Sequence, residues 1–174
     1  MRKLFVMDEK NYTSNMEVVT RYGVRAVIVR DGKIATERGM AGDFKILGGG
    51  IDAGETWREA VIREVKEESG LFVIPETIEE IGEVEELRRD RFCQDQVYHN
   101  ITYVYRCQVK EVSIAPQMTD SELAKGYQLY WATPEEIIEA GPGFGEQPWI
   151  VRDAKIIEML QREGLLIESE SCSK

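Results

Sequence analysis

The sequence has little of what builds disulfide frameworks or zinc sites: three cysteines and one histidine among 174 residues. Cys93, Cys107 and Cys172 are odd in number and form no C-x-x-C pair, so we expect reduced thiols. His99 stands alone within a strand-like segment, where a structural role is favoured over catalysis.

Long apolar runs and internal repeats are also missing. No run approaches the ~20 apolar residues that a bilayer crossing needs, and Asp8 comes too early for a signal peptide. A cytoplasmic protein without membrane partners is therefore expected. No linker or repeat divides the chain, which predicts one domain over residues 1–174 with a core at about 20–165.

Positive charge is scarce, because 22 Lys and Arg stand against 32 Asp and Glu, a formal net charge of −10. Broad binding to nucleic-acid backbones requires a basic face, so the composition argues against that activity. A small anionic substrate is still compatible with this composition if local positive charge overcomes the overall negative field of the protein. The oligomeric state is left open, with a homodimer among the options.

The order of predicted elements is that of an α/β protein. Residues 22–29 are rich in β-branched side chains, and the Asp31-Gly32 turn would let residues 34–36 pair back as a hairpin. Further strands are predicted over 97–109 and 127–132. Capping and periodicity predict helices over 57–69, from 134 to Gly141, and over 152–161.

The helix predicted over 57–69 carries acids where an amphipathic helix would carry leucine or isoleucine. Glu64 and Glu68 continue the face of Ala60 and Val61, with Glu67 at its edge. Buried carboxylates are costly unless paired, and acids three or four residues apart repel each other. A cation such as Mg²⁺ would resolve this conflict, because it binds a few carboxylates and bridges to phosphates.

The loop before this helix contains three consecutive glycines. A solvated acidic patch paired with Arg63 and Lys66 would be the simpler interpretation of the acids alone. Gly48, Gly49 and Gly50 favour a site instead, because glycines permit positive φ and close approach of the backbone to a phosphate. These three glycines are predicted to contact the substrate.

At this point the sequence resembles the Nudix box, G-x5-E-x7-R-E-U-x-E-E-x-G-U, in which U is a bulky aliphatic residue. Together with the surrounding elements, the resemblance extends over residues 22–160. It implies the family's α/β/α sandwich with a mixed β-sheet. The matching residues are Gly49, Glu55, Arg63, Glu64, Val65, Glu67, Glu68, Gly70 and Leu71.

The resemblance implies metal-dependent hydrolysis of a diphosphate bond in a nucleoside diphosphate derivative, with release of a nucleoside monophosphate. Mg²⁺ or Mn²⁺ would be the cofactor. Glu55 and Arg63 would pair and tie the loop to the helix, as part of the catalytic set. The implied metal ligands are Gly49, through its carbonyl, Glu64, Glu67 and Glu68.

The general base is open between Glu68 and Glu122, because relatives often place an additional acid in the loop that contains Glu122. An ordinary solvated glutamate is an equal alternative there. Glu83, Glu85 and Glu86 rank lower, since a charge run is usually a solvated face.

The substrate class is also open. Arg25 shares a strand face with Arg21 and Gly23 and is a candidate for binding substrate phosphates, against the alternative of surface pairing with acids. Residues 85–87 lack the Pro or Tyr marker of relatives specialised for ADP-ribose or dinucleoside polyphosphates. Nucleoside triphosphates, nucleotide sugars, dinucleoside polyphosphates and capped RNA remain candidates. The alternative function is a non-catalytic nucleotide sensor, against which the intact acid set argues.

Overall fold

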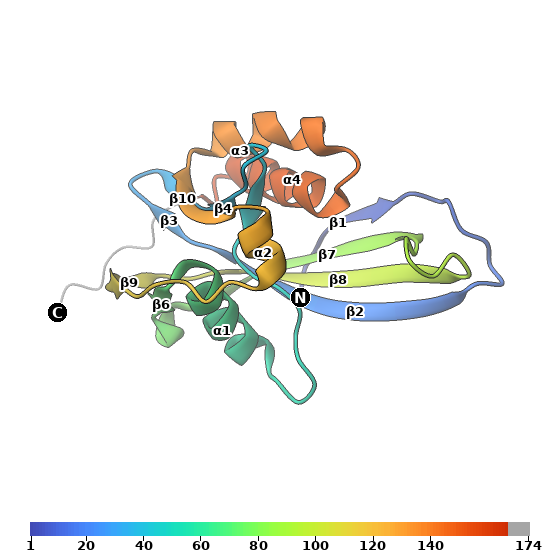
Figure 1. Ribbon diagram of the computed structural model, residues 1–174, viewed down its shortest axis with the longest axis horizontal. Helices are drawn as coiled ribbons and strands as arrows, with labels where there is room; N and C mark the ends of the chain where they lie inside the picture. The colour runs from blue at the N-terminus through green and yellow to red at the C-terminus, as the bar shows by residue number, and fades with distance from the viewer. Residues whose placement is uncertain (167–174) are drawn as a thin grey trace.

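The computed structural model describes residues 1–166, apart from the side chains of Ser121 and Glu122. Helix α1 lies on one side of the β-sheets and helices α3 and α4 lie on the other (Figure 1). The first sheet contains both parallel and antiparallel pairs. The expected α/β/α arrangement with a mixed sheet is thereby confirmed.

Ten strands, four α-helices and two short 3-10 helices alternate along the described chain. The strands are β1 (Lys3–Asp8), β2 (Glu17–Val27), β3 (Val29–Arg30), β4 (Lys33–Arg38), β5 (Phe44–Ile46), β6 (Leu71–Val73), β7 (Glu79–Arg89), β8 (Gln96–Arg106), β9 (Val109–Ser113) and β10 (Gln128–Ala132). The helices are α1 (Trp57–Ser69), η1 (Pro75–Thr77), α2 (Asp120–Ala124), α3 (Pro134–Ala140), η2 (Gly141–Phe144) and α4 (Pro148–Arg162).

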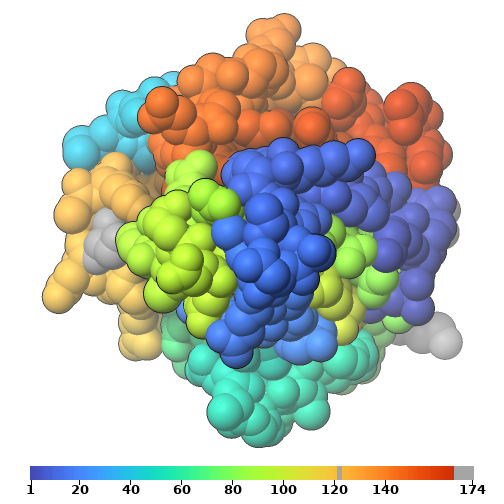
Figure 2. All heavy atoms as spheres, turned by 90° about the vertical axis from the view of Figure 1, so that its right-hand side faces the viewer, coloured from blue at the N-terminus to red at the C-terminus, as the bar shows by residue number. Residues whose placement is uncertain are grey.

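The first sheet has the order β1-β7-β8-β2. Strands β7 and β8 form an antiparallel hairpin, β1 runs parallel to β7, and β2 runs parallel to β8 along its whole length. Figure 2 looks onto the end of this sheet, where the segment before β2 (blue) lies beside the β7–β8 turn (yellow-green). Strand β1 also shows that the sheet includes residues ahead of the core boundary predicted near residue 20.

The predicted opening hairpin is confirmed at its turn, where β3 pairs with β4 across Asp31 and Gly32, but residues 22–27 belong to β2, which pairs with β8 in the first sheet. Only the two-residue strand β3 turns back onto β4, in a second sheet that also contains β10 and β5. A turn signal identifies the end of a strand but not its partner, which here is distant in the sequence. The strand predicted over 97–109 divides into β8 and β9, and β9 pairs with β6.

Helix α1 occupies the residues that its capping signals predict. Thr56 and Glu59 form a capping box, and Gly70 ends the helix at a φ of 73°. Helix α3 follows its prediction as well. Helix α4 begins at Pro148, ahead of the predicted 152, and a short helix α2 replaces the predicted loop at Glu122.

Two apolar clusters fill the spaces between the layers. One contains Ala60, Val61 and Val65 of α1 with residues of the first and third sheets, and the other lies against α3 and α4. At the start of α1, Trp57 stacks on Tyr105 of β8 with ring centroids 4.6 Å apart. This packing fixes the face that α1 turns toward the glycine loop.

The structure bears on two further expectations. Cys93 and Cys107 are free thiols, as predicted, and Cys172 lies outside the described residues. Burial raises the pKa of the Cys107 thiol to about 12. None of the described helices combines the length and apolarity that crossing a membrane requires.

Candidate functional site

The glycine loop lies directly against strand β2. The Val24 amide donates to the Gly49 carbonyl at 2.9 Å, and Gly23 and Gly50 form an isolated β-bridge. Gly48 has a φ of 134°, and a Cβ atom there would overlap with the Val24 carbonyl oxygen. Close approach to β2 therefore requires glycine at position 48.

Two acids of α1 contact the loop from the other side. The Gly48 amide donates to Oε2 of Glu68 at 2.6 Å. A Cβ atom at Gly49 would overlap with the carboxylate of Glu64. The absence of side chains in the loop thus creates the space that these carboxylates occupy.

Arg63 makes the predicted pair with Glu55. Its Nε lies 2.7 Å from Oε1 and its Nη2 lies 2.8 Å from Oε2 of that carboxylate, a bidentate arrangement. The hydrogen bonds between these two side chains lower the pKa of Glu55 and raise the pKa of Arg63. Arg63 also donates to the Gly50 carbonyl at 3.0 Å, so it joins the loop to the helix.

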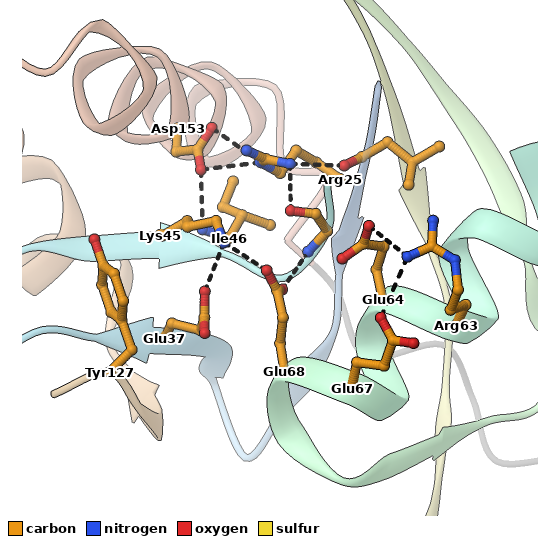
Figure 3. A network of polar contacts seen from close by, with 12 residues as sticks. Arg25, Glu37, Lys45, Ile46, Arg63, Glu64, Glu67, Glu68, Tyr127 and Asp153 are labelled. Atoms are coloured by element: carbon orange, nitrogen blue, oxygen red, sulfur yellow. Dashed lines mark hydrogen bonds and ion pairs between the residues drawn. The ribbon is translucent and has the colours of Figure 1, made fainter. Parts of the chain in front are cut away.

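Arg63 reaches the acids of α1 too, although the sequence placed it off their face. Its Nη1 lies 2.7 Å from Oε1 of Glu64 and 3.3 Å from Oε2 of Glu67 (Figure 3). Burial nevertheless raises the pKa of Glu64, against the opposing effect of Arg63. The prediction from helical periodicity missed this contact, because periodicity does not account for the length of an arginine side chain.

Lys45 of β5 and Glu37 of β4 complete the network, and sequence reasoning missed both. Lys45 Nζ lies 2.5 Å from Oε1 of Glu68 and 2.7 Å from Oε2 of Glu37. Glu37 is fully buried and Glu68 is 2% exposed. The signal available in the sequence was a lysine close to the glycine loop. It was missed because a lysine in a short strand usually faces solvent.

The pKa values of Glu68 and Lys45 are both raised, Glu68 by burial and Lys45 by neighbouring charges. Burial raises the pKa of Glu68 to about 7, because it outweighs the attraction of Lys45. Burial also acts to lower the pKa of Lys45, but the charges of Glu68 and Glu37 outweigh it, so that pKa is raised as well. The raised pKa of Lys45 favours its charged form, whereas the raised pKa of Glu68 makes that carboxyl group a weaker acid.

Three of the four acids of the box, Glu64, Glu67 and Glu68, line one cavity of about 330 Å³, here called the acid cavity. Arg63 and Lys45 pair with these acids but also with Glu55 and Glu37. The expected repulsion is therefore only partly relieved in the metal-free protein, and the charge of Glu68 still acts to raise the pKa of Glu64. Within the described residues, no three His, Cys, Asp or Glu side chains are grouped as around one metal ion. The cavity is lined by Gly48, Gly49, Gly50, Glu64, Glu67 and Glu68 with Arg25, Lys45, Arg63, Gln117 and Thr119.

The donor set fits Mg²⁺ or Mn²⁺ by chemistry, because carboxylate oxygens that line a cavity are the ligands that hard cations take. Binding would require the carboxylates to exchange Arg63 and Lys45 for the metal. The Gly49 carbonyl already accepts the Val24 amide, so its role as a ligand stays a prediction.

Arg25 is buried, which overturns the alternative of surface pairing. It is 7% exposed, and its Nε lies 3.1 Å from Oδ2 of Asp153 on α4, a fully buried acid. Its Nη1 donates to the carbonyls of Val24 and Gly48 at 2.9 and 2.5 Å. Burial acts to lower the pKa of Arg25, but Asp153 and Glu68 outweigh it and raise that pKa. Arg25 thus braces the glycine loop and borders the acid cavity (Figure 3).

The remaining candidates lie elsewhere. Glu122 belongs to α2, and its side chain is outside the described part of the chain, so its role as base stays a prediction. Glu85 and Glu86 belong to β7, and Glu86 is buried against Arg88 instead of being solvated. His99 lies 2.9 Å from Oε1 of Glu85, which is consistent with a structural role.

The structure so far defines an α/β/α sandwich with an acid-lined cavity beneath a glycine loop. A model of the NUDIX domain matches residues 19–155, and the chain belongs to the Nudix family. A search of curated proteins found no match.

Solved structures show the same fold at low identity. A NUDIX hydrolase from Nitrosomonas europaea is 18% identical, with 89% of this chain and 100% of that chain covered and a TM-score of 0.60. A MutT NUDIX hydrolase from Burkholderia pseudomallei is 24% identical, with 67% and 85% covered and a TM-score of 0.52. At these identities the likeness establishes the fold alone.

Proposed function

We propose that this protein is a metal-dependent pyrophosphohydrolase that cleaves a diphosphate bond in a nucleoside diphosphate derivative and releases a nucleoside monophosphate. The observation that carries the proposal is the acid cavity, in which Glu64, Glu67 and Glu68 of the box meet the glycine loop. Membership of the Nudix family supports the same activity.

The proposed metal ligands are Glu64, Glu67 and Glu68, with the Gly49 carbonyl. When bound, Mg²⁺ or Mn²⁺ supplies charge neutralisation for the diphosphate and lowers the pKa of a water molecule. Arg63 would keep the glycine loop and α1 together through its contacts with Glu55 and the Gly50 carbonyl.

Glu68 or Glu122 would accept the proton of the attacking water. Gly48, Gly49 and Gly50 would let the substrate phosphates approach the backbone. Arg25 would add positive charge at the border of the same cavity.

A non-catalytic nucleotide sensor is the second candidate. The observation in its favour is that Lys45 and Arg63 already pair with Glu68 and Glu64 without a metal. Such a protein would bind nucleotides in this cavity and release them unchanged.

The experiment is a panel of nucleoside triphosphates, ADP-ribose and dinucleoside polyphosphates incubated with Mg²⁺ or Mn²⁺, with nucleotide products and phosphate both measured. Metal-dependent release of nucleoside monophosphate supports the proposal, provided that Glu64→Gln abolishes it. Glu139→Gln, which removes an exposed acid on α3, is the matched control. Calorimetric binding across the panel without any product would establish the sensor instead.

A further inference from the structure

Glu37 is not among the residues that line the acid cavity, yet it contacts a lysine that does. In the register of β4 and β5, Glu37 lies directly opposite Lys45, so the two side chains leave the sheet on the same face. Strand β4 also pairs with β10, which places Glu37 in the interior of its sheet. The residue is fully buried, and Lys45 Nζ lies 2.7 Å from its Oε2.

Lys45 connects Glu37 with the acid cavity. Its ammonium is shared by two carboxylates, because Oε1 of Glu68 lies 2.5 Å away, and Figure 3 shows both carboxylates turned toward it. The ring of Tyr127, with its centroid 5.9 Å from Nζ, adds a further favourable surface for a cation. The Lys45 side chain is 15% exposed, so water solvates this ammonium poorly and its protein partners matter more.

One oxygen of Glu37 has no role in this arrangement. Oε2 accepts from Lys45, whereas Oε1 is buried and has no hydrogen-bond partner among the described residues. A buried oxygen without a partner is costly, so a carboxylate that served only to fix one lysine would be expected to have both oxygens satisfied. An ammonium group has three donors, and the second oxygen of Glu37 can accept another hydrogen bond from the same lysine.

Metal binding in the acid cavity creates a need for that acceptor. Glu68 must exchange Lys45 for the cation, and the exchange takes one countercharge and one hydrogen bond from the ammonium. Removing a partner from a buried charge is costly, because the protein interior does not replace the solvation by water. Glu37 lowers this cost, since Lys45 can stay with a fully buried carboxylate and bond to its second oxygen.

We propose that Glu37 is a positioning residue of the metal site, which acts through Lys45 and sets the affinity of the acid cavity for its divalent cation. In the metal-free protein, Lys45 bridges the two carboxylates while Glu68 accepts from the Gly48 amide. When the cation binds, Lys45 remains with Glu37 and releases Glu68. The inference rests on the proposed function, because the cation is the one required there.

The affinity for Mn²⁺ tests the proposal without any substrate. Glu37→Gln keeps the size and one acceptor oxygen but removes the countercharge, so calorimetry should show Mn²⁺ binding about tenfold or more weaker. Glu37→Asp keeps the charge and should recover most of the affinity, because the flexible lysine can follow the shorter side chain. A Glu37→Gln protein that is folded by circular dichroism and binds Mn²⁺ like the parent would overturn the proposal.

Asp43→Asn is the matched control. Asp43 is 5% exposed, precedes β5 and accepts a hydrogen bond from Tyr127 at 2.6 Å. The variant therefore removes a buried carboxylate from the same region but leaves the pair of Lys45 and Glu37 in place. Its Mn²⁺ affinity should stay within about twofold of the parent. An equal loss of affinity in Asp43→Asn and Glu37→Gln would mean a general effect of buried charge and would overturn the proposal.

A measurement on the unmutated protein makes the test independent of whether the Glu37 variants fold. In proton–nitrogen NMR spectra of the lysine ammonium groups, the Lys45 resonance is identified by its loss in Lys45→Arg. Mg²⁺ should shift this resonance, because the ammonium exchanges Glu68 for the second oxygen of Glu37. A resonance that stays unchanged when Mg²⁺ saturates the protein would overturn the proposal.

Turnover of the substrate panel distinguishes a failure of this inference from a failure of the proposed function. If nucleotides are cleaved but Glu37→Gln binds Mn²⁺ like the parent, the pyrophosphohydrolase activity stands and the role of Glu37 is wrong. If no substrate is cleaved but the Mn²⁺ affinity falls in Glu37→Gln and not in Asp43→Asn, the proposed function fails and the role of Glu37 in metal binding stands.

Discussion

At the scale of single residues, Arg63 connects the loop before α1 with the acids on α1. It contacts the carboxylates of Glu55, Glu64 and Glu67 and the carbonyl of Gly50. We expect Arg63→Ala to lower the free energy of unfolding by about 2 kcal/mol, because it leaves Glu55 without its bidentate partner. Urea unfolding measures this change.

Activity should fall in the same variant, since the glycine loop loses its connection to α1 through Arg63. Arg63→Lys is the informative companion, because lysine retains the charge but not the planar fork and should recover little of the loss. A variant that unfolds like the parent while losing only turnover would move Arg63 from the framework into the substrate site.

Glu68 has two partners in the metal-free protein, the Gly48 amide and the Lys45 ammonium. Glutamine has a single acceptor oxygen, so Glu68→Gln should lower the free energy of unfolding of the metal-free protein by about 1 to 2 kcal/mol. The rate of diphosphate cleavage should fall by about two to three orders of magnitude if a metal ligand or base is lost.

Glu67→Gln separates the loss of activity from the loss of stability, because the side chain of Glu67 is 41% exposed and pairs with Arg63 at 3.3 Å in the described part of the chain. Its metal-free stability should match the parent in chemical denaturation. If the Glu68→Gln variant retained its turnover, Glu68 would be removed from the proposed mechanism.

At the scale of elements, the end of α1 depends on Gly70, which is constrained both by its backbone conformation and by the neighbouring chain segment. Gly70 has a φ of 73°, and a Cβ atom there would overlap with the backbone carbonyl of Ile114. Gly54 has a φ of 84°, but no atom lies within 4 Å of its Cβ position. Gly54→Ala should therefore cost only the left-handed backbone conformation, about 1 to 2 kcal/mol.

Gly70→Ala should cost at least about 2 kcal/mol more than Gly54→Ala, because the backbone near Ile114 must move. Thermal and urea unfolding of the two variants side by side provide the comparison. Equal losses would mean that the segment after Gly70 yields without cost and does not hold the end of α1 in place.

At the scale of the whole molecule, metal binding should be visible as stability. Mg²⁺ that binds only the folded acid cavity at 100 times its Kd stabilises the protein by about 2.7 kcal/mol, or roughly 5 to 10 °C in Tm. Exchange of Lys45 and Arg63 for the metal offsets part of this gain. Matched monovalent salt should do less, and identical melting in chelator and in millimolar Mg²⁺ would exclude the metal site.

Local sequence signals determined the parts of this fold that depend on neighbouring residues. Thr56, Glu59 and Gly70 set both ends of α1, because capping bonds join residues a few positions apart. The Glu55–Arg63 pair was implied by the resemblance to the Nudix box and is present. The α/β/α class followed from the same pattern and is shown by the fold.

Tertiary structure decided the contacts between residues far apart in the chain. Lys45 reaches Glu68, and Arg25 meets Asp153 of α4, at sequence separations that no periodicity encodes. The partner of β2 was fixed in the same way, because β8 pairs with it in parallel although β3 to β7 lie between the two strands in the sequence. Residue types and spacings therefore specified the box and its helix, whereas the buried charges around them depend on which strands and helices pack together.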